Sequence, residues 1–346
     1  MSEKVTIYTL ANELNMSVSA VSRAFNPNTR LAPEKRKIIL EAAKKAGYRQ
    51  NKMASRLSQD PIRIGILICK RIELFYSQVL SGVESAVNDF SNFKLTCDIR
   101  TLSIENYNTE SACSILNEFK EAGYDGIIIQ GMYNITISNK INELADSGIK
   151  VVTLHNDLPD SKRLFTSTMD TEVAGAMVAE LFDMVLPRTR RNVIVFSGPM
   201  LSIVHQGLIS SYIRHADAYK LKLLKHYDTA DLPKNAEKMV KEAFSKYPEV
   251  NGIYISSSNS IPICQYLEDN GLSNKIFVIA SDIFKELNAY IYKGVVNATI
   301  YQSPSSQGYS AVESLYYSIA ESKEIPDRLL AKPQVVFSSN LSLYNI

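Results

Sequence analysis

The sequence has 346 residues, 45% of them hydrophobic, and a formal net charge of +2 at pH 7. This length exceeds one small domain and predicts a small unit joined to a larger one, with ample apolar material for a core. No apolar stretch approaches the roughly eighteen residues of a membrane span, and no apolar segment marks a signal peptide at the N-terminus, so a membrane protein or a secreted protein is disfavoured.

Residues 6–26 predict two short helices joined by a tight turn. Apolar residues recur at helical spacing up to Leu14, and Ser17 is a suitable cap for a second helix that continues to Phe25. The face of this second helix that points away from the apolar side consists of Val18, Ser19, Ser22 and Arg23. Such a helix fits the major groove of DNA, where its first residues meet base edges. On this stretch alone, two core helices of a small α domain explain the pattern equally well.

A third helix is predicted from Lys35 to Lys45, opened by Pro33-Glu34 and stopped by Gly47. Its inward face is expected to consist of Ile38, Ile39, Ala42 and Ala43. Residues 1–60 contain eleven Lys and Arg and five Asp and Glu, a net +6, so the remaining residues carry −4. A basic unit joined to a mildly acidic body is the expected footprint of phosphate binding confined to one end of the chain.

From Ile62 onward short apolar strands alternate with amphipathic helices. Strands are predicted at 62–69, 95–101, 126–129, 150–154, 192–196, 221–225, 252–255, 276–281 and 334–337. Helices are predicted at 78–90, 110–122, 137–147, 172–186 and 235–247. This rhythm predicts an α/β body of two doubly wound lobes, each with a parallel sheet covered on both faces. Ligands of such sheets bind at the carboxyl ends of the strands, so two facing lobes make a cleft.

Motifs of catalysis and cofactor binding are missing from the body. No GxGxxG, GxxxxGK[ST] or GxSxG sequence follows a strand, and the four histidines are dispersed. Cys69, Cys97, Cys113 and Cys264 are scattered without a CxxC pair, which favours free thiols in a reducing cytoplasm. We therefore expect no cofactor, no metal and no catalytic residue, and an enzyme is the least favoured class.

The N-terminal run resembles the headpiece of the lactose-repressor (LacI/GalR) family of bacterial transcription regulators. The matching motifs are Thr9-Leu10-Ala11, Ser17-Val18-Ser19, Val21-Ser22-Arg23, Phe25-Asn26, Ala46-Gly47-Tyr48 and residues 51–57. The body is similar to the effector-binding core of that family, which is related to periplasmic sugar-binding proteins. The main matches there are Ile64-Gly65-Ile66, Phe75-Tyr76, Ser281-Asp282, Gln302-Ser303-Pro304 and Gln307-Gly308.

The resemblance implies a sequence-specific DNA-binding regulator, expected to be a repressor, in the bacterial cytoplasm at the nucleoid. It implies a homodimer on near-palindromic operator DNA. The DNA-binding residues carried over are Thr6, Ser17, Val18, Ser19, Ser22, Arg23, Asn26, Tyr48, Asn51 and Leu57. Leu57 would wedge into the minor groove.

The implied domain bounds place a helix-turn-helix headpiece in residues 1–48 and a hinge helix with its linker in 49–61. The core covers 62–346. Its first lobe comprises about 62–160 and 303–325, and its second about 161–302 and 326–346.

The candidate effector-binding residues are Phe75, Tyr76, His155, Asn156, His205, Asn259, Asp282 and Gln302. Asp282 would accept sugar hydroxyls, although a helix N-cap is the other interpretation. Gln302 would line the cleft or serve the hinge alone. Leu208 stands where many relatives place an effector-clamping arginine, which favours a neutral sugar or polyol over a sugar phosphate. The alternative function is that of a periplasmic-type sugar-binding protein without a regulatory role.

Overall fold

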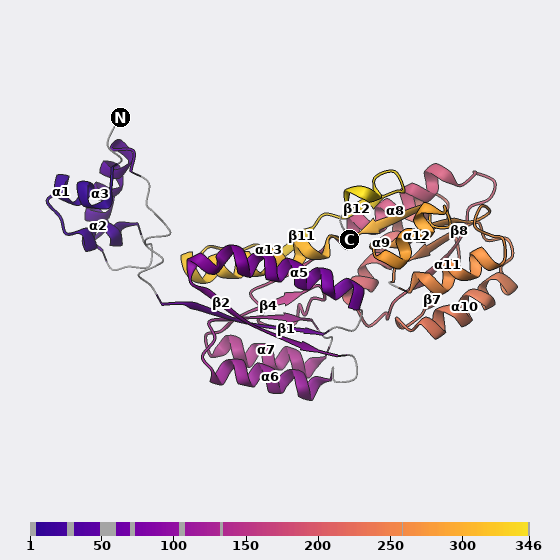
Figure 1. Cartoon of the computed structure of the whole chain (residues 1–346), viewed down its shortest axis with the longest axis horizontal. Helices are drawn as coiled ribbons and strands as arrows, with labels where there is room; N and C mark the ends of the chain where they lie inside the picture. The colour runs from indigo at the N-terminus through magenta and orange to yellow at the C-terminus, as the bar shows by residue number, and fades with distance from the viewer. Residues whose placement is uncertain are drawn as a thin grey trace.

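The computed structural model describes residues 5–25, 31–48, 60–69, 73–103, 108–131, 134–257 and 259–344. The predictions for Asn26, Asn51 and Leu57, and the expected hinge helix up to residue 59, lie outside these residues. A three-helix unit lies at one end of the long axis of the molecule, followed by two α/β lobes (Figure 1). Within the described ranges, no helix is long and apolar enough to cross a membrane.

The N-terminal unit consists of α1 (Ile7–Glu13), α2 (Val18–Ala24) and α3 (Pro33–Lys45). Ser17 caps α2 as predicted, because its hydroxyl accepts a hydrogen bond from the Ala20 amide at 3.2 Å. The unit has its own small core of Leu10, Ala11, Val21, Ala24, Ile39 and Ala43. The predicted inward position of Ile38 is wrong: its side chain is 49% exposed, since α3 buries only the narrow stripe of Ile39 and Ala43.

The first lobe is built on a parallel sheet with the strand order β11-β5-β4-β3-β1-β2. Its strands are β1 (Ile62–Cys69), β2 (Leu95–Leu102), β3 (Gly126–Gln130), β4 (Lys150–Leu154), β5 (Phe165–Met169) and β11 (Arg328–Ala331). Its helices are α5 (Glu73–Phe90), α6 (Thr109–Glu121), α7 (Ile135–Asp146) and α13 (Pro304–Glu321), with the 3-10 turn η1 (Ser91–Phe93). Helices α5 and α13 cover one face of this sheet, and α6 and α7 cover the other (Figure 1).

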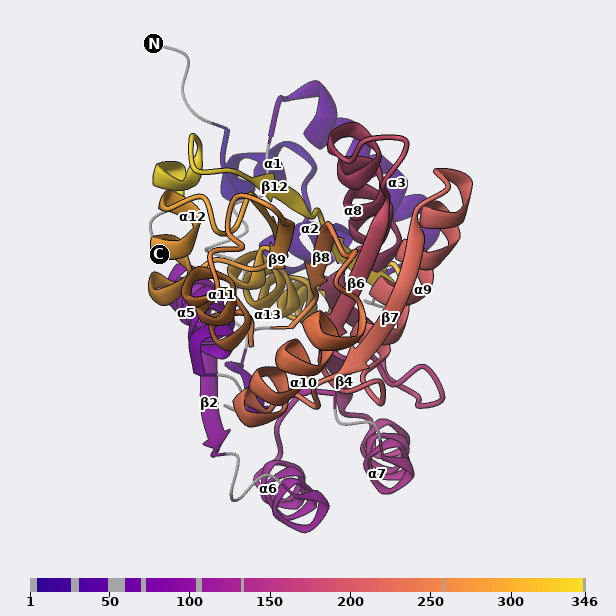
Figure 2. The ribbon, with the colours of Figure 1, turned by 90° about the vertical axis from the view of Figure 1, so that its right-hand side faces the viewer.

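The second lobe repeats this plan with the strand order β12-β10-β9-β8-β6-β7. Its strands are β6 (Asn192–Ser197), β7 (Lys222–Asp228), β8 (Gly252–Ile255), β9 (Phe277–Ser281), β10 (Ala298–Tyr301) and β12 (Gln334–Val336), of which β12 runs antiparallel to β10. Its helices are α8 (Thr171–Val185), α9 (Ile203–Ala218), α10 (Pro233–Lys246), α11 (Ser260–Asp269) and α12 (Lys285–Tyr292), with the turn η2 (Leu341–Leu343). Helices α8 and α9 lie on one face, and α10, α11 and α12 on the other (Figure 2). The expected two-lobed α/β body with helix-covered parallel sheets is confirmed.

The lobe boundaries expected near residues 160 and 326 are wrong. Strand β5 pairs with β4, Phe165 opposite Val152, so the first lobe extends to Met169. Strand β11 pairs with β5, Arg328 opposite Thr166, so residues 328–331 also belong to the first lobe. Neither strand is a plain apolar run: β5 reads FTSTM, and β11 is a partly exposed edge strand. The chain crosses between lobes at Asp170, at 302–303 and at 332–333.

Candidate functional site

A cavity of about 490 Å³ lies between the lobes, at the carboxyl ends of the strands of both sheets. Of the predicted effector residues, the cavity is lined by Phe75, Tyr76, His155, Asn156, His205, Asp282 and Gln302. Asn259 does not line it, because this residue is the N-cap of α11, and Ser256 and Ser257 take its place in the wall. Seven side chains scattered over more than two hundred residues thus converge on one space, as expected for an α/β cleft.

Asp282 and Gln302 form a tightly bonded pair on the second-lobe side of the cavity. The Gln302 side-chain amide donates to Asp282 Oδ2 at 2.6 Å, and the Gln302 backbone N–H donates to Oδ1 at 3.2 Å. Asp282 is held at φ +64° by its own N–H to the Ile300 carbonyl and by Thr299 Oγ1, which donates to its carbonyl at 2.6 Å. The N-cap interpretation of Asp282 is wrong, since Phe284 occupies the N-cap of α12.

Burial sets the charge of this carboxyl group. Asp282 is 4% exposed, and desolvation raises its pKa from 3.8 to about 7, against the opposing effect of the two hydrogen bonds from Gln302. Near neutral pH the cavity therefore contains a carboxyl group that is easily shifted between its ionised and neutral forms. A ligand hydroxyl that donates to this group favours the ionised form.

Gln302 Oε1 and Ser256 Oγ are buried polar atoms of the wall for which the described residues supply no hydrogen-bond partner. The Gln302 amide nitrogen is committed to Asp282, which leaves Oε1 as an acceptor. Leaving a buried polar atom unsatisfied costs about 1–3 kcal/mol. This wall of the cavity therefore favours a ligand that brings hydrogen-bond donors, as a sugar or polyol does.

Three rings, those of Phe75, Tyr76 and His155, form the aromatic part of the first-lobe wall. The ring centroid of Phe75 lies 5.0 Å from that of Tyr76 and 4.5 Å from that of His155. Burial lowers the pKa of His155 to about 4, so its ring is neutral at pH 7. His155 Nδ1 lies 3.4 Å from Gln307 Oε1, and its backbone N–H donates to the Ser167 carbonyl. These residues offer an apolar surface against which the carbon face of a sugar ring can pack.

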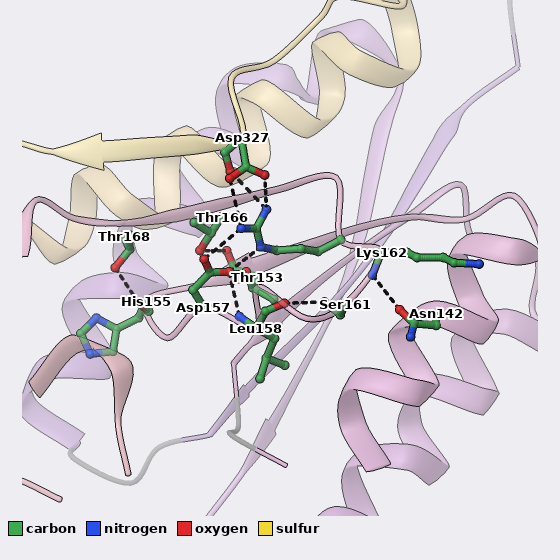
Figure 3. Close-up of polar contacts among 11 residues, drawn as sticks. Asn142, Thr153, His155, Asp157, Leu158, Ser161, Lys162, Thr166, Thr168 and Asp327 are labelled. Atoms are coloured by element: carbon green, nitrogen blue, oxygen red, sulfur yellow. Dashed lines mark hydrogen bonds and ion pairs between the residues drawn. The ribbon is translucent and has the colours of Figure 1, made fainter. Parts of the chain in front are cut away.

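Asp157 also lines the cavity, but its hydrogen bonds lie within the first lobe. Arg163 forms an ion pair with Asp157 and a second one with Asp327, with 2.7 Å between Nη1 and Oδ1 of Asp327. Asp157 Oδ1 also accepts from Thr153 Oγ1 and from the Leu158 N–H (Figure 3). This network compensates the charge of Asp157 and fastens the start of β11 to the loop after β4.

No lysine or arginine lines the cavity within the described ranges. Leu208 does not face it either: this side chain is buried in the core between α8 and α9. His205 Nε2 lies 3.9 Å from Asp231 Oδ2, which adds an acidic residue to the wall. An anionic ligand would therefore meet the carboxyl groups of Asp157, Asp231 and Asp282 and no lysine or arginine of the lining, which disfavours phosphate.

Asp231 and Ser256 are wall residues that the sequence analysis missed. Both follow the carboxyl ends of strands, which is the signal that could have found them. Asp231 was hidden because the strand predicted to end at residue 225 continues to Asp228. Ser256 was hidden because a run of serines offers no distinctive chemistry.

The N-terminal unit presents a second candidate surface. Ser19 and Arg23 are exposed side by side on α2, with Arg23 Nη2 donating to Ser19 Oγ at 2.7 Å. Val18 and Ser22 on the same helix are partly exposed. Thr6 and Ser17 are exposed caps of α1 and α2. Tyr48 instead packs against Phe25, at 5.4 Å between ring centroids, so part of its surface serves the core of the unit.

Comparisons with known proteins agree with this architecture. The model of the periplasmic binding protein domain matches residues 64–323. The catabolite control protein A of Priestia megaterium is 28% identical over 215 residues, 61% of this chain and 60% of the relative. The chain thus matches about three fifths of the length of that relative, and the match to such LacI/GalR regulators confirms the resemblance read from the sequence motifs.

Two solved structures show the same fold. A glucose-galactose binding protein of Geobacillus stearothermophilus, GanP, superposes with a TM-score of 0.72 at 22% identity, covering 82% of this chain and 99% of its own. A structure described as a LacI transcriptional regulator of Bacteroides fragilis gives 0.73 at 18% identity, covering 83% of this chain and all of its own. At these identities the likeness concerns the fold.

Proposed function

We propose that this chain, which belongs to the family of periplasmic binding protein domains, is a DNA-binding transcription regulator controlled by a small neutral sugar or polyol. The sugar binds in the cavity between the lobes, and the three-helix unit is a helix-turn-helix headpiece that reads operator DNA. The protein acts as a homodimer in the bacterial cytoplasm, most simply as a repressor.

The observation that carries this proposal is the pairing of two sites on one chain. The cavity wall offers a bonded carboxyl group, unsatisfied acceptors and an aromatic face, which together suit a hydroxylated, uncharged ligand. The N-terminal unit is basic and exposes Ser19 and Arg23 on one helix. Arg23 would bind guanine, with Ser19 holding its guanidinium in place.

A sugar-binding protein of a transport system is the alternative, because GanP shares the fold of the body. The three-helix unit before β1 favours the regulator, since a folded basic unit of this kind serves no step in carrying a sugar. DNA binding therefore separates the two functions.

Selection of binding sites from a random duplex library, followed by fluorescence anisotropy, tests the DNA-binding half of the proposal. We expect a near-palindromic consensus bound at nanomolar to submicromolar concentration, with Arg23→Ala binding it more weakly and losing selectivity at one base pair in each half-site. A chain that selects no consensus but is stabilised by sugars would be a sugar-binding protein.

A thermal-shift panel tests the ligand half. The panel contains D-glucose, D-galactose, D-arabinose and a polyol such as D-sorbitol, each hexose paired with its 6-phosphate. We expect stabilisation by a neutral member and none by a phosphate ester. Tight binding of a phosphate ester, measured by calorimetry, would refute this assignment of the ligand class.

A further inference from the structure

One side-chain hydrogen bond spans the mouth of the cavity from lobe to lobe. Asn156 follows β4 in the first lobe, and Ser202 precedes α9 in the second. Ser202 Oγ donates to Asn156 Oδ1 at 2.6 Å, and both residues line the cavity. Gln78 of α5 also bonds to the second lobe: its side chain donates to the Ile283 carbonyl and accepts from the Tyr301 hydroxyl, beside the crossing segment.

Asn156 is held rigidly for this contact. Its N–H donates to the Leu154 carbonyl at 2.9 Å, and its own carbonyl lies against Gly131. A Cβ atom at position 131 would come within 1.7 Å of that carbonyl oxygen, so only glycine permits this approach. The backbone of the first lobe therefore fixes where the Asn156 side chain points.

Ser202 bonds to Asn156 and does not cap α9. It occupies the N-cap position of α9, where a serine hydroxyl usually accepts a hydrogen bond from an amide of the first turn. The Ser202 side chain makes no such capping bond, whereas Ser17 at the N-cap of α2 does. In the conformation that donates to Asn156, the hydroxyl therefore accepts from no amide of the first turn of α9, and it can reach Asn156 only when the lobes are close together.

We propose that Asn156 and Ser202 form a latch that holds the cleft closed, with Ser202 returning to cap α9 when the lobes part. The biological role of the latch, control of the sugar cavity, rests on the proposed function. Its mechanics depend on this chain alone. When the lobes open, the hydrogen bond that caps α9 replaces part of the free energy lost with the bond to Asn156. The open and closed states therefore differ little in free energy, and ligand binding can shift the population from one to the other.

The test measures the distance between the lobes in the full-length protein without sugar or DNA. Spin labels at Ile135→Cys and Leu232→Cys, both exposed and beside the carboxyl ends of strands in opposite lobes, report closure by electron–electron double resonance. Cys97 and Cys113 are replaced by serine to prevent their labelling, while Cys69 and Cys264 are buried. Because no sugar is added, a failure of the latch is distinguishable from a failure of the proposed function.

Ser202→Gly removes the hydroxyl at little capping cost, and Asn156→Ala removes the acceptor. Because capping of α9 offsets part of the latch bond in the wild type, the ratio of long to short distances should rise by less than a full hydrogen bond would give, about threefold, in both variants. Ser202→Thr keeps the hydroxyl and should retain the wild-type distribution. Gln206→Ala is the matched control, because Gln206 donates to the Met200 carbonyl and steadies the same loop within the second lobe.

Hydrogen exchange at the amides of the first turn of α9 supplies a second measurement. In Asn156→Ala the released Ser202 hydroxyl should cap the helix and slow exchange, whereas Ser202→Gly should not slow it. Unchanged distances in both variants, equal lengthening in Gln206→Ala, or no slowing of exchange in Asn156→Ala would overturn the latch.

Discussion

Burial raises the pKa of the Asp282 carboxyl group to about 7, so this group titrates near neutral pH. Its pKa of about 7 exceeds the ordinary value of 3.8, so the folded state binds more protons than the unfolded state between these values. The free energy of unfolding therefore falls, as far as this group is concerned, while the pH rises from about 4 to 7, and stays level above 7. The neutral form of Asp282 thus favours folding, whereas the ionised form favours binding of a sugar hydroxyl.

We expect the affinity for a neutral sugar to rise between pH 6 and pH 8. Hydroxyl donors bind the ionised carboxylate better than the neutral acid, and ionisation is completed in this interval. Calorimetry of wild type and Asp282→Asn at several pH values measures the effect. The asparagine variant should lose the pH dependence; an affinity that falls with rising pH in wild type would contradict the proposed hydrogen-bond polarity.

Ser256 gives a test of ligand contact that is independent of charge. Its Oγ and that of Ser260 are both buried without a hydrogen-bond partner in the described structure, but only Ser256 lines the cavity. Replacing either by alanine should leave the melting temperature unchanged or higher, because a buried unsatisfied group is removed. Only Ser256→Ala should weaken sugar binding, by about threefold to tenfold as measured by calorimetry. Equal effects of both variants on affinity would exclude a direct contact.

At this scale the sequence predicts residues with distinctive chemistry better than those without. Asp282, Gln302 and His155 could be named because they match effector-binding positions of the LacI/GalR family, which the sequence resembles. The bond between Asp282 and Gln302 could not be foreseen, since it depends on a positive φ at Asp282 and on the place of β10 beside β9. The prediction that Asn259 lines the cavity was wrong, because the exact end of β8 decides which serine or asparagine faces the cavity.

Helices α5 and α13 pack so closely that two glycines at their contact leave no room for a side chain. A Cβ atom on Gly82 of α5 would lie 1.9 Å from the Ser305 carbonyl oxygen, and one on Gly308 of α13 would lie 2.2 Å from that of Val79. The two helices therefore approach backbone to backbone. Since α13 follows directly after the crossing at 302–303, this contact anchors the crossing to the first lobe.

Gly82→Ala should destabilise the protein by about 1–3 kcal/mol, because the helices must separate to admit the methyl group. Helix propensity alone predicts the opposite effect, because replacing glycine by alanine in a helix raises the free energy of unfolding by roughly 1 kcal/mol. Urea unfolding followed by circular dichroism decides between them. Ser81→Ala, at the exposed neighbouring position, is the control and should change stability little.

Helix α2 carries the prediction for DNA recognition. Arg23→Ala should cost about 1–3 kcal/mol in operator binding and relax specificity at one base pair in each half-site. Lys44→Ala, which alters the exposed side of α3, should weaken binding about equally for all sequences and reduce its salt dependence, without changing the specificity. Anisotropy titrations with the selected operator and its point variants supply the measurement. Undiminished selectivity in Arg23→Ala would show that α2 does not read bases.

For the elements, hydrophobic period predicted the central strands well and the peripheral ones poorly. Strand β1 is a nearly continuous apolar run because both of its faces are buried. Strands β5 and β11 carry Thr, Ser and Arg among their apolar residues, so no run marks them. Helices α9, α11, α12 and α13 were not among the helices predicted, and of these only α11 and α12 are short, with ten and eight residues.

At the scale of the whole molecule, the cavity and the N-terminal unit are built from separate sets of residues. Asp282→Ala should therefore abolish the effect of the sugar on operator binding while leaving the affinity for DNA in the absence of sugar within about twofold of wild type. Anisotropy with and without the panel sugar measures both quantities. A sugar response that survives Asp282→Ala would place the ligand elsewhere.

The interleaving of the lobes has a consequence for synthesis on the ribosome. The edge strands β11 and β12 come last in the chain order, one for each sheet, only two residues apart. Until they emerge, β5 and β10 each present an uncovered row of backbone amides and carbonyls, a surface prone to pairing with another nascent chain. A stop codon near residue 325 would leave both sheets unfinished at once. We therefore expect such truncated chains to aggregate instead of accumulating as a single intact lobe.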